Sequence, residues 1–100
     1  MNKAPRIRIS ENELRGKFNS NEGGYPARRA SLKLRRVYDE PASPLSKQEP
    51  GTRSIVDTYY DDADRKVMTL HCFLKPDGTL GGSGKPDPKE LLVDDIMYYK

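Results

Sequence analysis

The 100-residue sequence contains no tryptophan, one cysteine and one histidine. A single cysteine, Cys72, excludes an internal disulfide and any zinc site built from several cysteines. Long apolar runs are also missing. No segment approaches the roughly 20 residues that span a membrane, and the N-terminal MNKAPRIRIS lacks the apolar centre of a signal peptide. We therefore expect a cytoplasmic protein with no bound metal and no membrane partner.

Apolar residues are scarce, at 34%, and charged residues make up 33% of the chain. A chain of this length forms one domain and buries about two-thirds of the surface that its unfolded form exposes. The composition predicts a thin, two-layer α+β fold over residues 1–100. We expect an antiparallel sheet of about four or five strands, with one short helix packed on one face.

The clearest helix signal follows a short alternating segment, PRIRIS, which predicts a strand. Ser10 and Glu13 have the spacing of a capping box, in which each side chain accepts a hydrogen bond from the other residue's backbone N–H. A helix is therefore expected over residues 11–18. Leu14 and Phe18 are four residues apart and should form its buried side.

Strand patterns dominate the middle of the chain. Residues 27–38 alternate between apolar and polar side chains, and the alternation slips at Arg35–Arg36, where a β-bulge is expected. Residues 53–60 and 66–74 are rich in β-branched and aromatic residues and flank a polar turn, which predicts a hairpin. Its second strand should direct Met68, Leu70, Cys72 and Leu74 toward the core, and Thr69, His71 and Phe73 toward the opposite face.

Two segments are expected to be loops. Residues 40–53 contain three prolines and no periodicity, which predicts a mobile loop. Residues 75–88 are rich in glycine and proline, and their GGSGK motif lacks the first glycine and the Ser/Thr of a phosphate-binding loop, so no nucleotide cofactor is expected. Beyond them, Asp87 and Pro88 predict one helical turn. Ile96–Tyr99 should form an edge strand.

Positive charge is concentrated in the first half of the chain. Residues 1–50 carry eleven Lys/Arg against six Asp/Glu, although the net charge of the whole chain is only +3. Much of it lies in one predicted strand, and we expect this basic strand surface to bind nucleic acid or an acidic protein. Tyrosine rings near arginines suit base stacking or protein contact. The expected binding residues are Arg28, Arg29, Lys33, Arg35 and Arg36. A merely solvated strand face is the plainer interpretation.

Catalytic signals are weak, so the main hypothesis is a non-catalytic binding protein. His71 is the one weak catalytic candidate. In a first alternative, a metal-independent ribonuclease or toxin-like enzyme uses His71 with Arg35 or Arg36. In a second alternative, the chain is an oligomerisation module that pairs copies through the edge strand Ile96–Tyr99. The aspartates at 57, 61, 62 and 64 fit turn chemistry better than a metal site.

Overall fold

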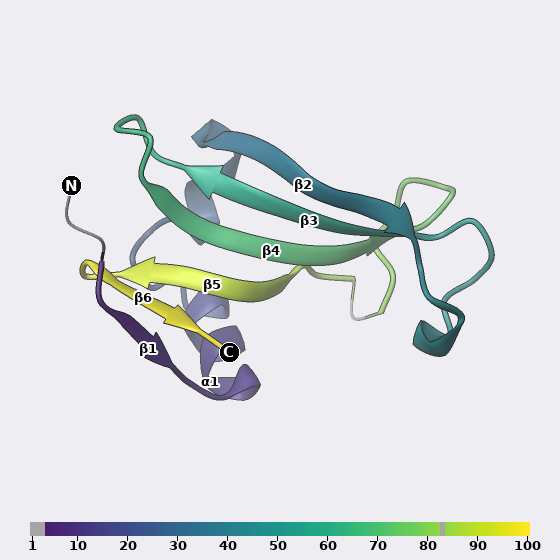
Figure 1. Ribbon diagram of the computed structural model, residues 1–100, viewed down its shortest axis with the longest axis horizontal. Coiled ribbons are helices and arrows are strands. Elements are labelled where there is room, and N and C mark those ends of the chain that lie inside the picture. The colour runs from purple at the N-terminus through teal and green to yellow at the C-terminus, as the bar shows by residue number, and fades with distance from the viewer. Residues whose placement is uncertain (1–3, 83) are drawn as a thin grey trace.

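The computed structural model describes residues 4–82 and 84–100. Six strands form one mixed sheet in the order β1-β6-β5-β4-β3-β2 (Figure 1). The chain runs antiparallel from β2 through β6, whereas β1 lies parallel to β6. The α+β class is confirmed. The sheet has six strands instead of the expected four or five, and one pair, β1 with β6, is parallel instead of antiparallel. The strands are β1 (Arg6–Arg8), β2 (Lys33–Pro41), β3 (Arg53–Tyr60), β4 (Lys66–Leu74), β5 (Asp87–Val93) and β6 (Ile96–Tyr99).

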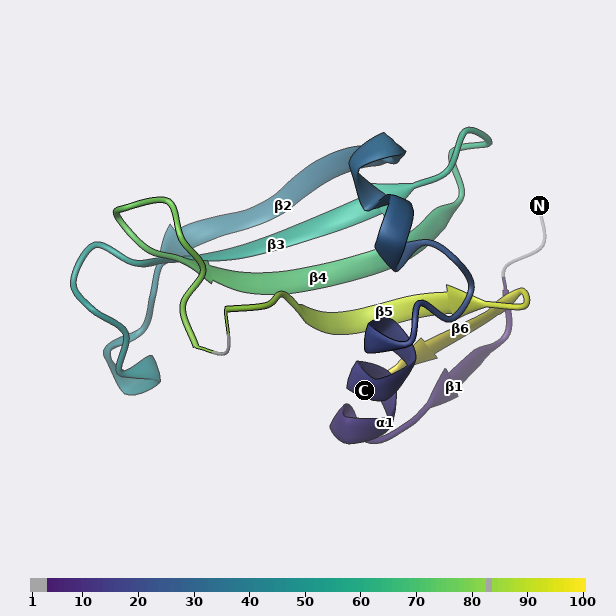
Figure 2. The ribbon, with the colours of Figure 1, turned by 180° about the vertical axis from the view of Figure 1, so that it is seen from behind.

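The one α-helix among the described residues, α1 (Glu11–Asn19), begins at the expected capping box. The Glu13 backbone N–H donates to Ser10 Oγ at 3.1 Å, and the Ser10 N–H donates to Glu13 Oε1 at 3.4 Å. Leu14 and Phe18 are buried, as expected from their spacing. Figure 2 shows α1 lying across β5 and β6 on one side of the sheet.

The sheet has two different faces, which its register defines. Tyr59, Met68, Leu91 and Tyr98 lie opposite one another on four neighbouring strands, so their side chains share a face. Lys17 of α1 lies 4.4 Å from the centre of the Tyr98 ring, which identifies this as the face toward the helix. We call it the helix-side face and its opposite the open face. The main core lies between the helix-side face and α1.

Residues 27–32 were expected to begin a strand, but they do not form one. They belong mostly to a 3-10 helix, η1 (Pro26–Ser31), which begins at a proline and lies beside β3 and β4 in Figure 2. The strand β2 begins only at Lys33. The expected bulge exists one residue farther along, because the register shifts between Arg36 and Tyr38 and leaves Val37 as the extra residue.

The C-terminal expectations also need correction. Asp87–Val93 forms β5 instead of a helical turn, because its backbone pairs with β4 on one side and β6 on the other. Ile96–Tyr99 is a strand, but it lies between β5 and β1 and is not an edge. The expected edge at Ile96–Tyr99 is therefore wrong, and pairing of copies through some edge of the sheet stays a prediction. The two edges of the sheet are β1 and β2.

The long connections gather at the end of the sheet remote from α1 (Figure 1). Residues 40–53 include the end of β2 and a 3-10 helix, η2 (Pro44–Ser46). The connection within residues 75–88 forms a turn and an isolated bridge between Leu74 and Leu80, and its Ser83 lies outside the described residues. Among the described helices, none is both long and apolar enough to cross a membrane.

Candidate functional site

The open face is the side of the sheet that the described helices leave uncovered. It faces the viewer in Figure 1, with α1 and η1 behind the sheet. The register assigns its side chains to five rows that run across the strands. These rows are Lys33–Tyr60–Lys66, Arg35–Thr58–Thr69–Glu90–Tyr99–Arg8, Tyr38–Val56–His71–Asp87, Glu40–Ser54–Phe73 and Leu92–Met97–Arg6. Leu92 and Met97 are buried, so the last row exposes mainly Arg6.

The open face carries both cationic and aromatic side chains, and they alternate in the row Lys33–Tyr60–Lys66. The Arg6 guanidinium lies 4.6 Å from the centre of the Tyr99 ring, and the His71 and Phe73 rings meet edge to face at 4.8 Å. A cation over the face of a ring is attracted to it, which holds Arg6 and Tyr99 together at this surface. The cations are Arg6, Arg8, Lys33, Arg35 and Lys66, and the rings are Tyr38, Tyr60, His71, Phe73 and Tyr99.

Glu90 organises the centre of the open face. Its carboxylate accepts hydrogen bonds from Arg6 Nη1 at 2.7 Å, from Lys66 Nζ at 3.0 Å and from Thr69 Oγ1 at 3.0 Å. Burial by itself raises the pKa of Glu90, but the bonds from Arg6 and Lys66 outweigh it and hold the pKa below its usual value. The carboxylate is therefore ionised at neutral pH and fixes two cations in place.

Two arginines on the open face carry charge that no carboxylate offsets. Arg8 and Arg35 are exposed, and neither forms an ion pair with any residue in the described part of the chain. Lys33 differs because Asp64 accepts a hydrogen bond from its ammonium group at 2.7 Å, which raises the pKa of Lys33. Arg8 and Arg35 lie at opposite ends of one row, so the face is cationic at both sides.

The structure separates the five basic residues that the sequence places on one strand. Lys33 and Arg35 reach the open face. Arg36 is on the helix-side face, where its Nε and Nη2 donate to the two Asp57 oxygens at 2.9 and 3.1 Å. The other two, Arg28 and Arg29, belong to η1, over the rings of Tyr25 and Phe18 respectively.

His71 has a partner that sequence reasoning missed. Its Nε2 lies 2.8 Å from Ser54 Oγ of the neighbouring strand β3. Burial, and then the charge of Lys89, lower the pKa of His71, so the ring is neutral at pH 7 and able to accept a proton. Only the strand register brings Ser54 and His71 together, and no sequence motif signals it.

The residues around His71 do not complete a catalytic set. Asp87 lies opposite His71, but its carboxylate is held by Lys100 Nζ at 2.7 Å and Arg15 Nη2 at 3.4 Å. Cys72 is on the other face, and burial raises the pKa of its thiol, which keeps the thiol protonated. The arrangement supports hydrogen bonding to a ligand more directly than it supports nucleophilic attack.

The carboxylate of Asp61 forms hydrogen bonds within the β3–β4 turn, as expected for this acidic residue. Its Oδ1 accepts hydrogen bonds from the backbone N–H groups of Ala63 and Arg65, at 3.0 and 2.9 Å, and its Oδ2 accepts one from the Arg65 side chain at 3.1 Å. These bonds lower the pKa of Asp61. The carboxylate therefore stabilises the β3–β4 turn.

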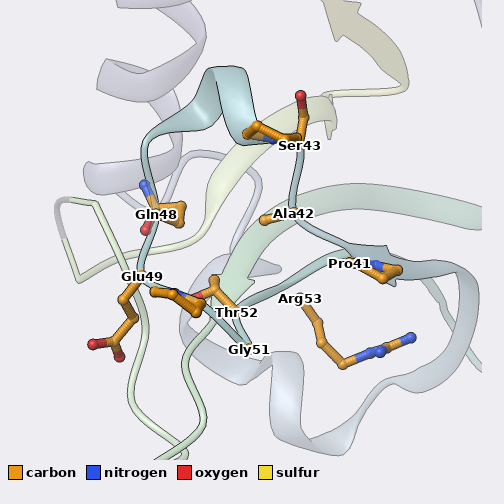
Figure 3. Close-up of a pocket in the computed structure, with 10 residues that line it drawn as sticks. Pro41, Ala42, Ser43, Gln48, Glu49, Gly51, Thr52 and Arg53 are labelled. Atoms are coloured by element: carbon orange, nitrogen blue, oxygen red, sulfur yellow. The ribbon is translucent and has the colours of Figure 1, made fainter.

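A hollow of about 410 Å³ lies in the β2–β3 connection, lined mainly by residues 41–44 and 48–53 (Figure 3). Its cation, Arg53, is already committed, since its Nε donates to Asp39 Oδ1 at 2.5 Å and its Nη2 to the Asp39 carbonyl at 3.0 Å. Thr52 is buried there, with no hydrogen-bond partner for its hydroxyl among the described residues. A hollow with one neutralised cation suits an anionic polymer less well than the open face does.

Comparison with known proteins gives no match to a family model, to a curated protein or to a solved structure.

Proposed function

We propose that this protein is a non-catalytic binding module that holds single-stranded nucleic acid on the open face. The observation that carries the proposal is the presence of both cations and aromatic rings on one uncovered face of the sheet. Lysine and arginine attract phosphates without regard to sequence. Flat rings between them stack on unpaired bases.

The dimensions of the open face suit a short single strand. The row from Arg35 to Arg8 crosses all six strands. Neighbouring strands are about 4.8 Å apart, so the row is about 24 Å long. That length accommodates a few nucleotides, comparable with the smallest sites of other sheet-based single-strand binders. Tyr99 lies within the row and Tyr60 next to it.

The rings favour nucleic acid over an acidic protein, the other partner that the charge allows. An acidic protein would pair with the cations and could pack against the rings, but its own charges and flat groups do not recur at a regular spacing. A nucleic acid uses both, because phosphates and bases alternate along its chain. The neutral His71 imidazole and the Ser54 hydroxyl add hydrogen-bonding groups that bases can contact.

The test measures the anisotropy of fluorescent RNA and DNA single strands of about 12 nucleotides, at about 50 and 200 mM salt. We expect binding that weakens steeply with salt. Arg8→Ala and Arg35→Ala should each reduce the salt slope by about one, because each removes one phosphate contact. Arg28→Ala is the matched control, since Arg28 is an exposed arginine of η1 outside the open face, and it should leave binding unchanged.

Three results contradict the proposal. One is no binding by the wild type at low salt. Another is a loss from Arg28→Ala as large as the loss from Arg8→Ala. The third is equal affinity for polyglutamate and for nucleic acid, which would show that charge alone drives binding and that the rings do not select bases.

The contact between Ser54 and His71 favours one second function, a metal-independent ribonuclease. A neutral imidazole is able to take a proton from a ribose hydroxyl, and Arg35 lies on the same face to stabilise the phosphate. Arg36 is not available for this role, because it is bound to Asp57 on the other face. Incubating labelled RNA with the wild type and with His71→Ala decides the question. If both leave the RNA intact, this second function is wrong.

A further inference from the structure

The edge strand β2 has an unpaired side. It is nine residues long, lies last in the sheet order and is exposed at every residue. Three of its side chains are large and apolar, yet Leu34, Val37 and Tyr38 are 51%, 53% and 47% exposed. A long edge with exposed apolar side chains is a template for pairing with another strand. Within the described residues, nothing covers it.

Charge along β2 divides into two halves of opposite sign. Lys33, Arg35 and Arg36 precede the bulge at Val37, and Asp39 and Glu40 follow it. An antiparallel strand with the same sequence sets its acidic half against this basic half. A parallel copy sets like charges together, which destabilises pairing.

The bulge makes this match possible on both faces. In a regular strand, residues 35 and 40 point to opposite faces because their separation is odd. The extra residue Val37 reverses the alternation, so Arg35 and Glu40 both lie on the open face. For the same reason, Arg36 and Asp39 both lie on the helix-side face.

We propose that two copies of this chain pair antiparallel along β2. The two-fold axis is perpendicular to the sheet and passes between Val37 and Tyr38. This register sets Arg35 opposite Glu40 of the second copy, and Arg36 opposite Asp39. Each pair occurs twice because of the symmetry.

The existing ion pairs show which contacts are new. Arg36 already forms an ion pair with Asp57, and Asp39 with Arg53. A contact between Arg36 and Asp39 of the second copy would therefore join two existing ion pairs. Arg35 and Glu40 have no ion-pair partner elsewhere in the described chain. Pairing gives each of them one. A second copy is thus the occupant that the charges of β2 fit best.

The expected dimer is weak. A nine-residue strand is about 30 Å long, and contact along one strand buries less surface than a standard stable interface. We therefore expect dissociation in the micromolar range. Arg35 also belongs to the proposed nucleic-acid surface, so the test of the dimer uses nuclease-treated protein with no nucleic acid present.

Analytical ultracentrifugation over a wide range of protein concentration tests the dimer. Arg35→Glu and Glu40→Arg should each weaken self-association at least tenfold, because each sets like charges opposite one another twice. The double variant should recover the dimer. Arg28→Glu, a reversal on η1, is the matched control and should leave self-association unchanged.

Mixing the two single variants gives the sharpest test. Each repels itself, but the pair brings unlike charges together at both positions, so the mixture should form a heterodimer that neither variant forms alone. Recovery by mixing also demonstrates that both variants are folded. A wild type that stays monomeric at all concentrations overturns the inference, as does a dimer that either reversal leaves intact. No recovery in the mixture overturns the register, provided that circular dichroism shows both variants folded.

Discussion

The substitution Glu90→Gln tests the electrostatics of the open face most directly. Glutamine keeps the size of the side chain and still accepts the hydrogen bond from Thr69, but it removes the charge that holds Arg6 and Lys66. Both cations then become free to contact a ligand. We expect tighter binding of single-stranded nucleic acid together with a less stable fold.

The structure sets the size of the stability loss. The Glu90 side chain is only 15% exposed, but those of Arg6 and Lys66 are 48% and 40% exposed, so water screens both ion pairs. Such pairs contribute about 0.2–1 kcal/mol each, and the expected loss at neutral pH is therefore about 1 kcal/mol.

The pH dependence gives a second signature. The pKa of Glu90 is held below its usual value of 4.5. Its contribution to stability is therefore complete at pH values above 4.5 and disappears as the pH falls through the lower pKa of the folded state. In acid, the wild type and Glu90→Gln should be equally stable.

Urea denaturation followed by circular dichroism at neutral and acidic pH measures both effects, with binding measured at neutral pH. Glu49→Gln is the control, because the Glu49 side chain is exposed and forms no ion pair with the described residues. The reasoning is refuted if Glu90→Gln weakens nucleic-acid binding while the protein stays folded. It is refuted equally if the stability loss is the same at both pH values.

Three further predictions concern packing and titration. Gly23→Ala should destabilise the fold more than Gly24→Ala in denaturant titrations: both glycines have positive φ, but only at Gly23 does an added Cβ meet a backbone atom, 2.5 Å from the Leu92 carbonyl oxygen. Equal losses contradict this. Leu14→Ala should cost about 2–5 kcal/mol in the same measurement, whereas Leu45→Ala, at a 90% exposed residue, should cost almost nothing. The His71 ring protons should titrate by NMR with a midpoint below 6.5 in the folded protein and near 6.5 in urea, and the reverse order contradicts burial as the cause.

Local signals in the sequence predict the local elements well. The capping box at Ser10 and Glu13 predicts α1, and the β-branched runs around a polar turn predict the β3–β4 hairpin. These features are predictable because the stabilising contacts lie within a few residues of each other. Met68 and Leu70 are buried as the alternation predicts.

The misplaced elements are those decided by distant parts of the chain. Asp87 and Pro88 resemble a helix start, yet pairing on both sides makes them strand residues. Val67 is buried although alternation assigns it to the face of Thr69, because a bulge between Tyr59 and Tyr60 shifts the register. Such effects depend on which strands become neighbours.

The same limit applies to the candidate site. A run of basic residues in the sequence suggests one surface, but Pro26 starts a 3-10 helix that separates Arg28 and Arg29 from β2. The bulge at Val37 then sets which later residues share a face with Arg35. The strand order is needed to predict that the cations of β1 and β4 lie on the same face as Arg35.

The parallel pairing of β1 with β6 has a consequence for folding. Arg6 lies opposite Met97, near the other end of the chain, whereas every other strand pairs with its neighbour in sequence. The meander can assemble through short loops, but β1 has no strand to dock on until β6 is in place. Closing this long loop costs the most chain entropy. Hydrogen exchange should therefore find the first strand protected last during refolding.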